Sequence, residues 1–321
     1  MNESTKHRMD QLFLSLKDRE RWLVGIESAA YLAVILTALL GNIVLTLAIY
    51  KTGTLRNSQN YFLVSLAATD ILNAVSCMPL TLAALITGKW PFEDFVCQLQ
   101  GSFWTICTGV SLLTLGLIAF NRYVKIVRSA SLYQKIFTRR NVWISIAISW
   151  LSSVFLSSSV FLVDKTAFSF HPGKSLCFFK HLNVTNRLGI YSTILYVILT
   201  SVAFSMIFFC YFKVLRKIRA HYAQVRNSSL QNRECAAFAE EIRITTMLFV
   251  TLLAICISWS PSVIIDFYEL FGNGQFMFKR QLYLLNVFTF QSSSAVNPFI
   301  YGLMNREFRE GYRRVLYCRD G

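Results

Sequence analysis

The chain has 321 residues, of which 54% are hydrophobic and only 15% are charged, and its formal net charge is +15. Soluble domains hold about a quarter charged residues. This composition excludes an ordinary soluble domain, a disordered chain and a collagen-like chain, and it favours a helical membrane protein. The length suits several spans joined by short loops better than a soluble domain beside a single anchor.

Residues 1–26 are polar and lack the apolar stretch of a cleavable signal peptide. Seven apolar windows follow, each long enough to cross roughly 30 Å of hydrocarbon as a helix. Their approximate bounds are Glu27–Tyr50, Asn60–Ile86, Phe95–Val127, Asn141–Val163, Leu188–Phe212, Ile244–Phe271 and Gln281–Met304. Only helices satisfy their own backbone groups in lipid, so we predict an all-α membrane protein with a seven-transmembrane helix bundle.

The segment after the last window is amphipathic. Its apolar face consists of Phe308, Tyr312, Val315 and Leu316, with arginines on the other faces. This pattern predicts a short eighth helix that lies on the inner leaflet. The predicted organisation is a tail over 1–26, the helix bundle over 27–304, and a cytoplasmic amphipathic helix and tail over 305–321.

Positive charge predicts the orientation. Of the 32 Lys and Arg residues, 20 fall in the segments 51–59, 121–140, 213–243 and 304–321. Short loops rich in Lys and Arg stay cytoplasmic, so the amino terminus is expected outside a plasma membrane that the chain crosses several times. The net positive charge is then expected to face anionic membrane lipids and acidic partners rather than nucleic acid.

The predicted outer side carries candidate modification sites. Cys97 and Cys177 both face an oxidising compartment, which favours a disulfide over two unpaired thiols. Asn2 and Asn183 begin glycosylation sequons. On the inner side, Cys318 follows the amphipathic segment and is either palmitoylated or a free thiol.

Asp70 is the only acidic residue near the middle of a window. Polar groups inside a membrane are costly, so each is a candidate for function. The first interpretation is a cation or proton site, with sodium as the expected ion and no other cofactor required. The alternative is a protonated Asp that only joins helices. The residues expected to complete the site are Ser111, Ser293, Ser294 and Asn297.

Pro261 and Pro298 interrupt helical hydrogen bonding in the last two windows and predict kinks. Trp259 lies close to the first kink, where it is either a ligand-driven toggle or a core aromatic. Arg122 ends a stretch without charged side chains that runs from Phe95 to Phe120, and a charge there needs water or a partner.

These residues together resemble class A (rhodopsin-like) G-protein-coupled receptors over nearly the whole chain. The matching positions are Gly41-Asn42, Asp70, Cys97, Asn121-Arg122-Tyr123, Trp150, Trp259, Pro261 and Asn297-Pro298-x-x-Tyr301. Within the class the chain is most similar to melatonin receptors, through Leu55-Arg56-Asn57, Trp90, Cys97-Gln98 and the Asn121-Arg122-Tyr123 variant itself. It departs from them by having Pro298 and by lacking their histidine in the fifth window.

The resemblance implies a receptor, not an enzyme, that binds an extracellular small ligand and activates heterotrimeric G proteins. An orphan receptor for a peptide or another small molecule is the alternative, and a seven-span transporter or channel is the candidate from a different class. Trp104 stands where amine receptors have an aspartate, which disfavours a biogenic amine. Gln291 stands where opsins have their lysine, so no Schiff base to retinal is expected there.

The resemblance also implies a switch at the inner end. Glu241 lies 20 residues before Pro261, the spacing at which the family carries the acidic partner of Arg122. We expect this pair to hold the resting state, although Glu241 is alternatively one more solvated loop charge. The other residues assigned to the switch and G-protein coupling are Asn121, Tyr123, Tyr211 and Tyr301.

The ligand pocket is expected between the outer halves of the third, fifth, sixth and seventh windows. Its candidate wall residues are Trp104, Thr105, Thr108, Leu195, Tyr196, Leu199, Ser262, Asp266, Val287 and Gln291. Most are apolar or neutral, which favours a small and partly aromatic ligand. Asp266 is the exception: it either binds a cationic ligand or is a rim charge paired with Lys279 or Arg280.

Overall fold

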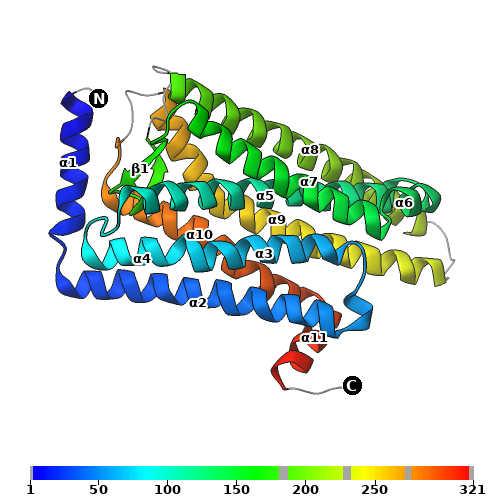
Figure 1. The fold of residues 1–321 in the computed structure, drawn as a ribbon. Coiled ribbons are helices and arrows are strands. Elements are labelled where there is room, and N and C mark those ends of the chain that lie inside the picture. The colour runs from blue at the N-terminus through cyan, green and yellow to red at the C-terminus, as the bar shows by residue number, and fades with distance from the viewer. Residues whose placement is uncertain (1–2, 181–186, 227–232, 272–275, 318–321) are drawn as a thin grey trace.

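A computed structural model describes residues 3–180, 187–226, 233–271 and 276–317, and within them long helices lie side by side as a bundle (Figure 1). The long helices are α2 (Arg21–Lys51), α3 (Asn60–Ser76) followed by α4 (Met78–Thr87), α5 (Asp94–Val127), α7 (Arg139–Ser159), α8 (Arg187–Arg226), α9 (Arg233–Phe271) and α10 (Arg280–Met304). Each predicted window overlaps most of one of these helices or, for the second window, a pair of them. Helix α8 continues beyond its window to Arg226, and α9 begins before its window at Arg233.

The second window is divided at Cys77, between α3 and α4. Pro79 is the second residue of α4 and has no N–H to donate to the preceding turn. The chain therefore starts a new helix there, in nearly the same direction (Figure 1).

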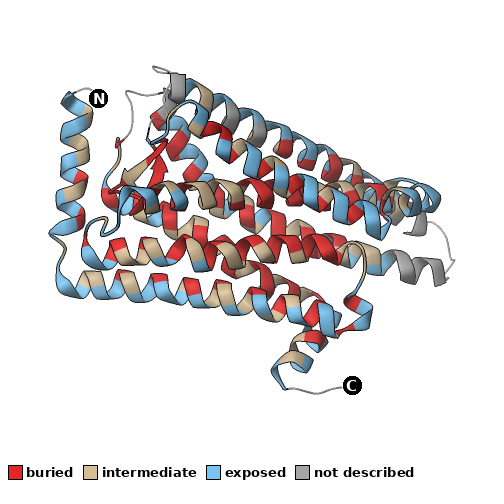
Figure 2. Ribbon diagram, viewed as in Figure 1, coloured by how far each residue is buried: buried red, intermediate tan, exposed pale blue. Residues whose placement is uncertain are grey.

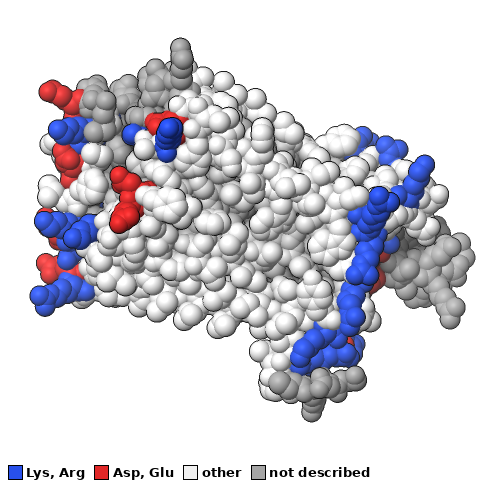
Figure 3. All heavy atoms as spheres, viewed as in Figure 1, with Lys and Arg blue, Asp and Glu red and all other residues white. Residues whose placement is uncertain are grey.

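The surface of the bundle is that of a multi-pass membrane protein. Five described helical segments are long and apolar enough to span a membrane: Arg21–Lys51, Asn60–Thr87, Asp94–Val127, Arg139–Leu162 and Ala239–Glu269. The side of the bundle in Figure 3 is uncharged, and Lys, Arg, Asp and Glu gather at its two ends. Helix α10 is less apolar because it carries inward-facing polar residues such as Asn286, Gln291 and Asn297.

Helices α3 and α5 occupy the middle of the bundle, where buried residues are most frequent (Figure 2). Two of the hydrophobic clusters among the described residues lie at opposite ends of the bundle. One, at the end where α2 begins (called the outer end), includes Tyr31, Met78 and Phe178. The other, at the end where α2 finishes (called the inner end), includes Phe62, Tyr301 and Phe308.

Several shorter elements were not specified by the apolar windows. Residues predicted only as a polar tail form helix α1 (Glu3–Lys17), which lies across one end of the bundle (Figure 1). A second short helix is α6 (Ala130–Ile136), and two 3₁₀ turns cover Gly53–Leu55 and Val160–Leu162. Strands β1 (Phe168–His171) and β2 (Leu176–Phe179) form an antiparallel hairpin in which Phe170 pairs with Cys177.

The predicted eighth helix is α11 (Arg306–Leu316), and it turns away from the end of α10 to pack on α2 (Figure 1). Phe308 is buried in this contact. Gly311 lies so close to α2 that an added Cβ would come within 3.1 Å of Ala48. The helix begins at Asn305, whose side chain accepts the N–H of Glu307.

Candidate functional site

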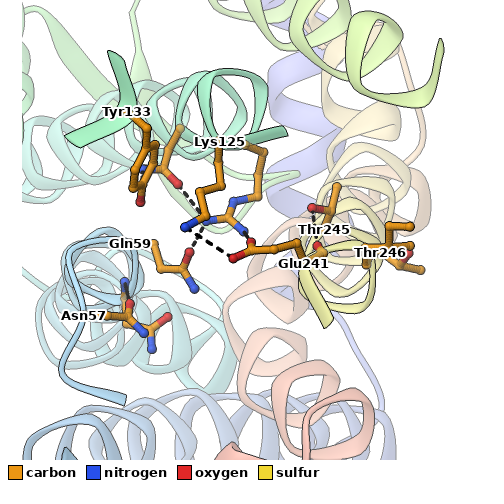
Figure 4. A network of polar contacts seen from close by, with 11 residues as sticks. Asn57, Gln59, Lys125, Tyr133, Glu241, Thr245 and Thr246 are labelled. Carbon is orange, nitrogen blue, oxygen red and sulfur yellow. Dashed lines mark hydrogen bonds and ion pairs between the residues drawn. The ribbon is translucent and has the colours of Figure 1, made fainter. Parts of the chain in front are cut away.

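Arg122 on α5 lies at the inner end with its side chain fully buried and meets a carboxylate from α9. Its Nη1 is 3.3 Å from Glu241 Oε2, while Lys125 Nζ is 3.4 Å from Glu241 Oε1. Arg122 also donates to Gln59 and, at 2.8 Å, to Asn121 Oδ1. Figure 4 shows Glu241 extending from α9 toward Lys125 and Gln59. The structure thus brings together the two residues expected to pair, and the pair joins α5 to α9.

The aromatic residues assigned to the switch lie around this ion pair. The Tyr123 ring is 6.0 Å from that of Phe209 on α8. The Tyr211 ring is 5.3 Å from that of Phe249 on α9. The Tyr301 ring packs at 5.7 Å from Phe308 of α11. These ring contacts join α5 to α8, α8 to α9 and α10 to α11.

Asp70 and the four residues predicted around it come together near the middle of the bundle. A cavity of about 30 Å³ is lined by Asp70, Ser111, Ser293, Ser294 and Asn297, together with other side chains that include Thr69 and Trp259. Asn297 donates to Asp70 Oδ2 at 3.1 Å, and its own buried amide oxygen has no hydrogen-bond partner in the described part of the chain. An unsatisfied buried oxygen beside a carboxylate fits a small hard cation, which takes oxygen ligands.

Both prolines lie inside their helices, and one freed carbonyl has a visible partner. Pro298 cannot bond the carbonyl of Ser294, and Asn42 of α2 donates to that oxygen at 2.9 Å. Gly41 allows the close approach, because an added Cβ would lie 3.1 Å from Pro298 Cγ. Near Pro261, Trp259 stacks on Phe290 with ring centroids 4.9 Å apart.

Five of the ten predicted pocket residues line one cavity of about 20 Å³ under the outer end: Trp104, Ser262, Asp266, Val287 and Gln291. The cavity also includes Lys174, Leu176, Phe178, Asn286 and Phe290, which were not predicted. Thr108 lines the Asp70 cavity instead. Thr105 donates to the carbonyl of Gly101 on its own helix.

Other predicted positions lie outside the described residues. This applies to Asn2, Asn183 and Cys318, and to the side chains of Leu195, Tyr196 and Leu199. Gln291 is described, and it is buried with its amide oxygen accepting from Asn73 at 2.6 Å. The absence of retinal chemistry at Gln291 stays a prediction.

Of the two alternatives for Asp266, the rim charge paired with Lys279 or Arg280 is wrong. Asp266 is buried, and its Oδ1 is 2.6 Å from Lys174 Nζ at the tip of the hairpin. Arg280 pairs with Glu27 of α2 instead. Lys174 escaped prediction because a loop lysine carries no sequence signal for burial; its only clue was its place three residues before Cys177.

The hairpin is fixed to α5 by the disulfide between Cys97 and Cys177. The Gln98 side chain donates to the carbonyl of Phe168 at 2.8 Å and accepts its N–H at 3.0 Å. Gln100 accepts the N–H of Cys177 at 2.8 Å. The hairpin is therefore a fixed cover over the outer cavity.

A bundle of membrane-spanning helices, with a disulfide-bound hairpin at one end and an Arg–Glu pair at the other, is the architecture of a seven-helix membrane receptor. The chain belongs to the 7 transmembrane receptor (rhodopsin family), whose model matches residues 41–301. This family and fold are those of receptors rather than enzymes. It is a class A G-protein-coupled receptor that resembles melatonin receptors.

Three relatives illustrate the similarity. "Melatonin receptor type 1C" of Gallus gallus is 27% identical over 90% of this chain and 81% of its own length, and "Melatonin receptor type 1B-B" of Danio rerio is 25% identical over 93% and 83%. "Rhodopsin, GQ-coupled" of Mizuhopecten yessoensis is 29% identical over 93% of this chain, which spans only 61% of that relative. Squid rhodopsin shares the fold, with a TM-score of 0.76, 23% identity, and coverage of 97% of this chain and 88% of that structure.

Proposed function

We propose that this receptor binds an extracellular small ligand and activates heterotrimeric G proteins from the plasma membrane. The observation that carries the proposal is the pair between buried Arg122 and Glu241, because it ties α5 to α9 at one end of the bundle. When α9 moves outward, this pair breaks and Arg122 becomes available to a G protein. Pro261 supplies the hinge and Trp259 the aromatic contact that couples the hinge to the cavity.

The proposed orientation puts the amino terminus outside. The disulfide lies at the opposite end from Arg122, where an oxidising compartment would maintain it. The Arg122 end is the Lys- and Arg-rich end in the sequence, as cytoplasmic ends are. The arginines of α11 then face anionic lipid headgroups.

The proposed ligand is small and partly aromatic. Trp104, Phe178 and Phe290 supply aromatic walls, and Ser262, Asn286 and Gln291 supply hydrogen-bonding groups. The likeness to melatonin receptors makes melatonin, which carries no ammonium group, the first uncharged probe. The hairpin and α1 cover this end, which favours a small molecule over a peptide.

We also propose that Asp70 and Asn297 hold a sodium ion as an allosteric stabiliser. The ion would supply positive charge to the buried carboxylate and hold α3 against α10. Replacing choline chloride by sodium chloride should raise the thermal unfolding midpoint of the purified receptor, and Asp70→Asn should abolish that rise. An equal rise of the midpoint in the variant would show that Asp70 does not hold the ion.

The function is tested by reconstituting the receptor in liposomes with purified heterotrimeric G proteins of each class. We expect faster nucleotide exchange than with empty liposomes, and loss of this acceleration in Arg122→Gln. Ion flux is measured across the same liposomes. Flux without any acceleration of exchange would overturn the proposal in favour of a transporter or channel.

A further inference from the structure

The outer cavity already contains an ammonium group, and it belongs to the protein. Lys174 Nζ lies 2.6 Å from Asp266 Oδ1 and 3.7 Å from the centre of the Phe178 ring. The two side chains of the ion pair are only 4% and 5% exposed. A carboxylate and an aromatic face are the partners that an organic ammonium ligand takes in a protein. Both are occupied here by a loop side chain.

The hairpin tip is shaped to place this lysine. The N–H of Lys174 donates to His171 Nδ1 at 3.1 Å, and the N–H of Ser175 donates to the His171 carbonyl at 2.8 Å. Ser175 adopts a left-handed φ of 53° that closes the turn. Gly173 rests on α10, where an added Cβ would lie 2.5 Å from the Tyr283 ring. Lys174 is therefore held inward by its backbone as well as by its charge.

The charges around the cavity favour a cation over an anion. Asp266 is buried, and Glu269, one turn further along α9, is buried as well. Glu269 accepts the N–H of Phe276 at 2.8 Å and that of Met277 at 3.3 Å, so it has partners of its own. If the Lys174 side chain leaves while the disulfide-bound hairpin stays in place, Asp266 remains as a buried carboxylate without its cation, which is costly. An incoming ammonium restores the pair, whereas an incoming carboxylate meets like charge.

We propose that Asp266 and Phe178 form an ammonium-binding site, that Lys174 occupies it in the resting receptor, and that the ligand carries an amine that replaces Lys174. The proposal rests on the proposed function in one respect only, that the molecule which replaces Lys174 is the receptor's ligand. The position on α5 that serves amine receptors is Trp104 here, so the carboxylate comes from α9 instead. Trp104, within the same cavity, then offers an aromatic wall to the rest of an arylalkylamine.

The site is tested by replacing the internal ammonium with an external one. Lys174→Ala should lower the thermal unfolding midpoint of the purified receptor in nanodiscs. Propylammonium, which matches the deleted atoms, should raise that midpoint by about 2–4 °C while leaving wild type almost unchanged. Neutral 1-propanol should not do so. Lys180→Ala, which removes an exposed lysine of the same loop, is the matched control and should show no amine-specific rise.

The double variant Lys174→Ala, Asp266→Asn should lose the response to propylammonium. A rise of equal size in wild type, in the double variant, or with 1-propanol would overturn the proposal. Stabilisation of wild type by propionate would also overturn it, because it would show that Lys174 binds an anion. If Lys174→Ala folds only when the amine is present, that rescue supports the proposal, and failure of the amine to restore folding contradicts it.

These measurements report binding and not signalling. Rescue by propylammonium without any G-protein activation would support the ammonium site and contradict the proposed activation of G proteins. Nucleotide exchange by wild type without rescue of Lys174→Ala would support the activation of G proteins and contradict the ammonium site.

Discussion

The two ends of the bundle hold their charges in different ways. At the outer end, Glu27 pairs with both Arg19 and Arg280, and Lys174 pairs with Asp266, and all five side chains are at most 9% exposed. At the inner end, Glu241 is 29% exposed and is shared between Arg122 and Lys125. Removing one partner of a pair in which both side chains are buried costs about 3–5 kcal/mol, whereas an exposed pair contributes about 0–1 kcal/mol. The inner pair lies between these cases, because Arg122 is buried and Glu241 is in contact with solvent.

The difference indicates where the receptor changes shape at low cost. The outer end also has the disulfide from α5 to the hairpin, and its α1 helix packs Leu12 against Phe276 and Tyr283. The inner end of α9 is held to its neighbours by polar contacts such as that of Arg243 with the carbonyl of Met304 at 3.3 Å. We infer that the outer end is the fixed frame and the inner end the moving part.

The largest expected effect comes from Glu27→Gln at the outer end. The change leaves two buried guanidinium groups, those of Arg19 and Arg280, without their carboxylate, so we expect a loss of about 3–5 kcal/mol of stability. Thermal unfolding of the purified receptor measures it. Glu93→Gln, at an exposed glutamate without a capping bond, is the control and should change stability by less than about 0.5 kcal/mol. Equal losses of stability in Glu27→Gln and Glu93→Gln would contradict the inference that buried ion pairs hold the outer end.

Much of this comparison could be predicted for the inner and middle regions, and little for the outer end. Asp70 and Asn297 stand on helices whose lengths and directions follow from the apolar windows. Glu241 lies before the window Ile244–Phe271, and its pairing with Arg122 was predicted from the family resemblance. Lys174 and Asp266 meet only because a hairpin folds back over the bundle, and neither apolar periodicity nor loop composition specifies that path. Helix α1 escaped prediction for a related reason: its two buried residues, Leu12 and Leu16, are a weak signal in a polar segment.

The next effect concerns signalling at the inner end. Glu241→Ala should raise basal nucleotide exchange severalfold, because a contribution of about 1 kcal/mol from the lost pair corresponds to roughly a fivefold change in population. Stability should change less than in Glu27→Gln, because the Arg122 guanidinium keeps its hydrogen bonds to Gln59 and Asn121. Glu240→Ala is the matched control, since that exposed neighbour pairs only loosely with Arg243, at 3.8 Å. Unchanged basal nucleotide exchange at equal surface expression would contradict the hypothesis that Glu241 restrains the receptor.

A smaller effect should appear at the outer end on acidification. Burial, and secondly the Lys174 cation, hold the pKa of His171 well below its usual value. The unfolded chain therefore takes up a proton near pH 6.5 while the folded hairpin does not, so stability falls as pH drops below that value, by at most about 1.4 kcal/mol per pH unit. Unfolding midpoints between pH 7.5 and 5.5 measure the slope. His171→Gln should flatten it and exposed His7→Gln should not; the reverse would exclude His171 as the group responsible.

The smallest effect tests how completely Arg122 depends on Glu241. Asn121 Oδ1 accepts from Arg122 at 2.8 Å without adding charge. Asn121→Asp would supply a second carboxylate and should lower basal exchange by about two- to fivefold, as expected for a pair contributing up to roughly 1 kcal/mol. Asn121→Ala removes the amide contact alone and separates charge from hydrogen bonding. In the Glu241→Ala background, Asn121→Asp should restore part of the lost restraint, because the two carboxylates act on the same guanidinium. A rise in exchange, or no change in either background, would mean that the inner end is held by packing and not by charge.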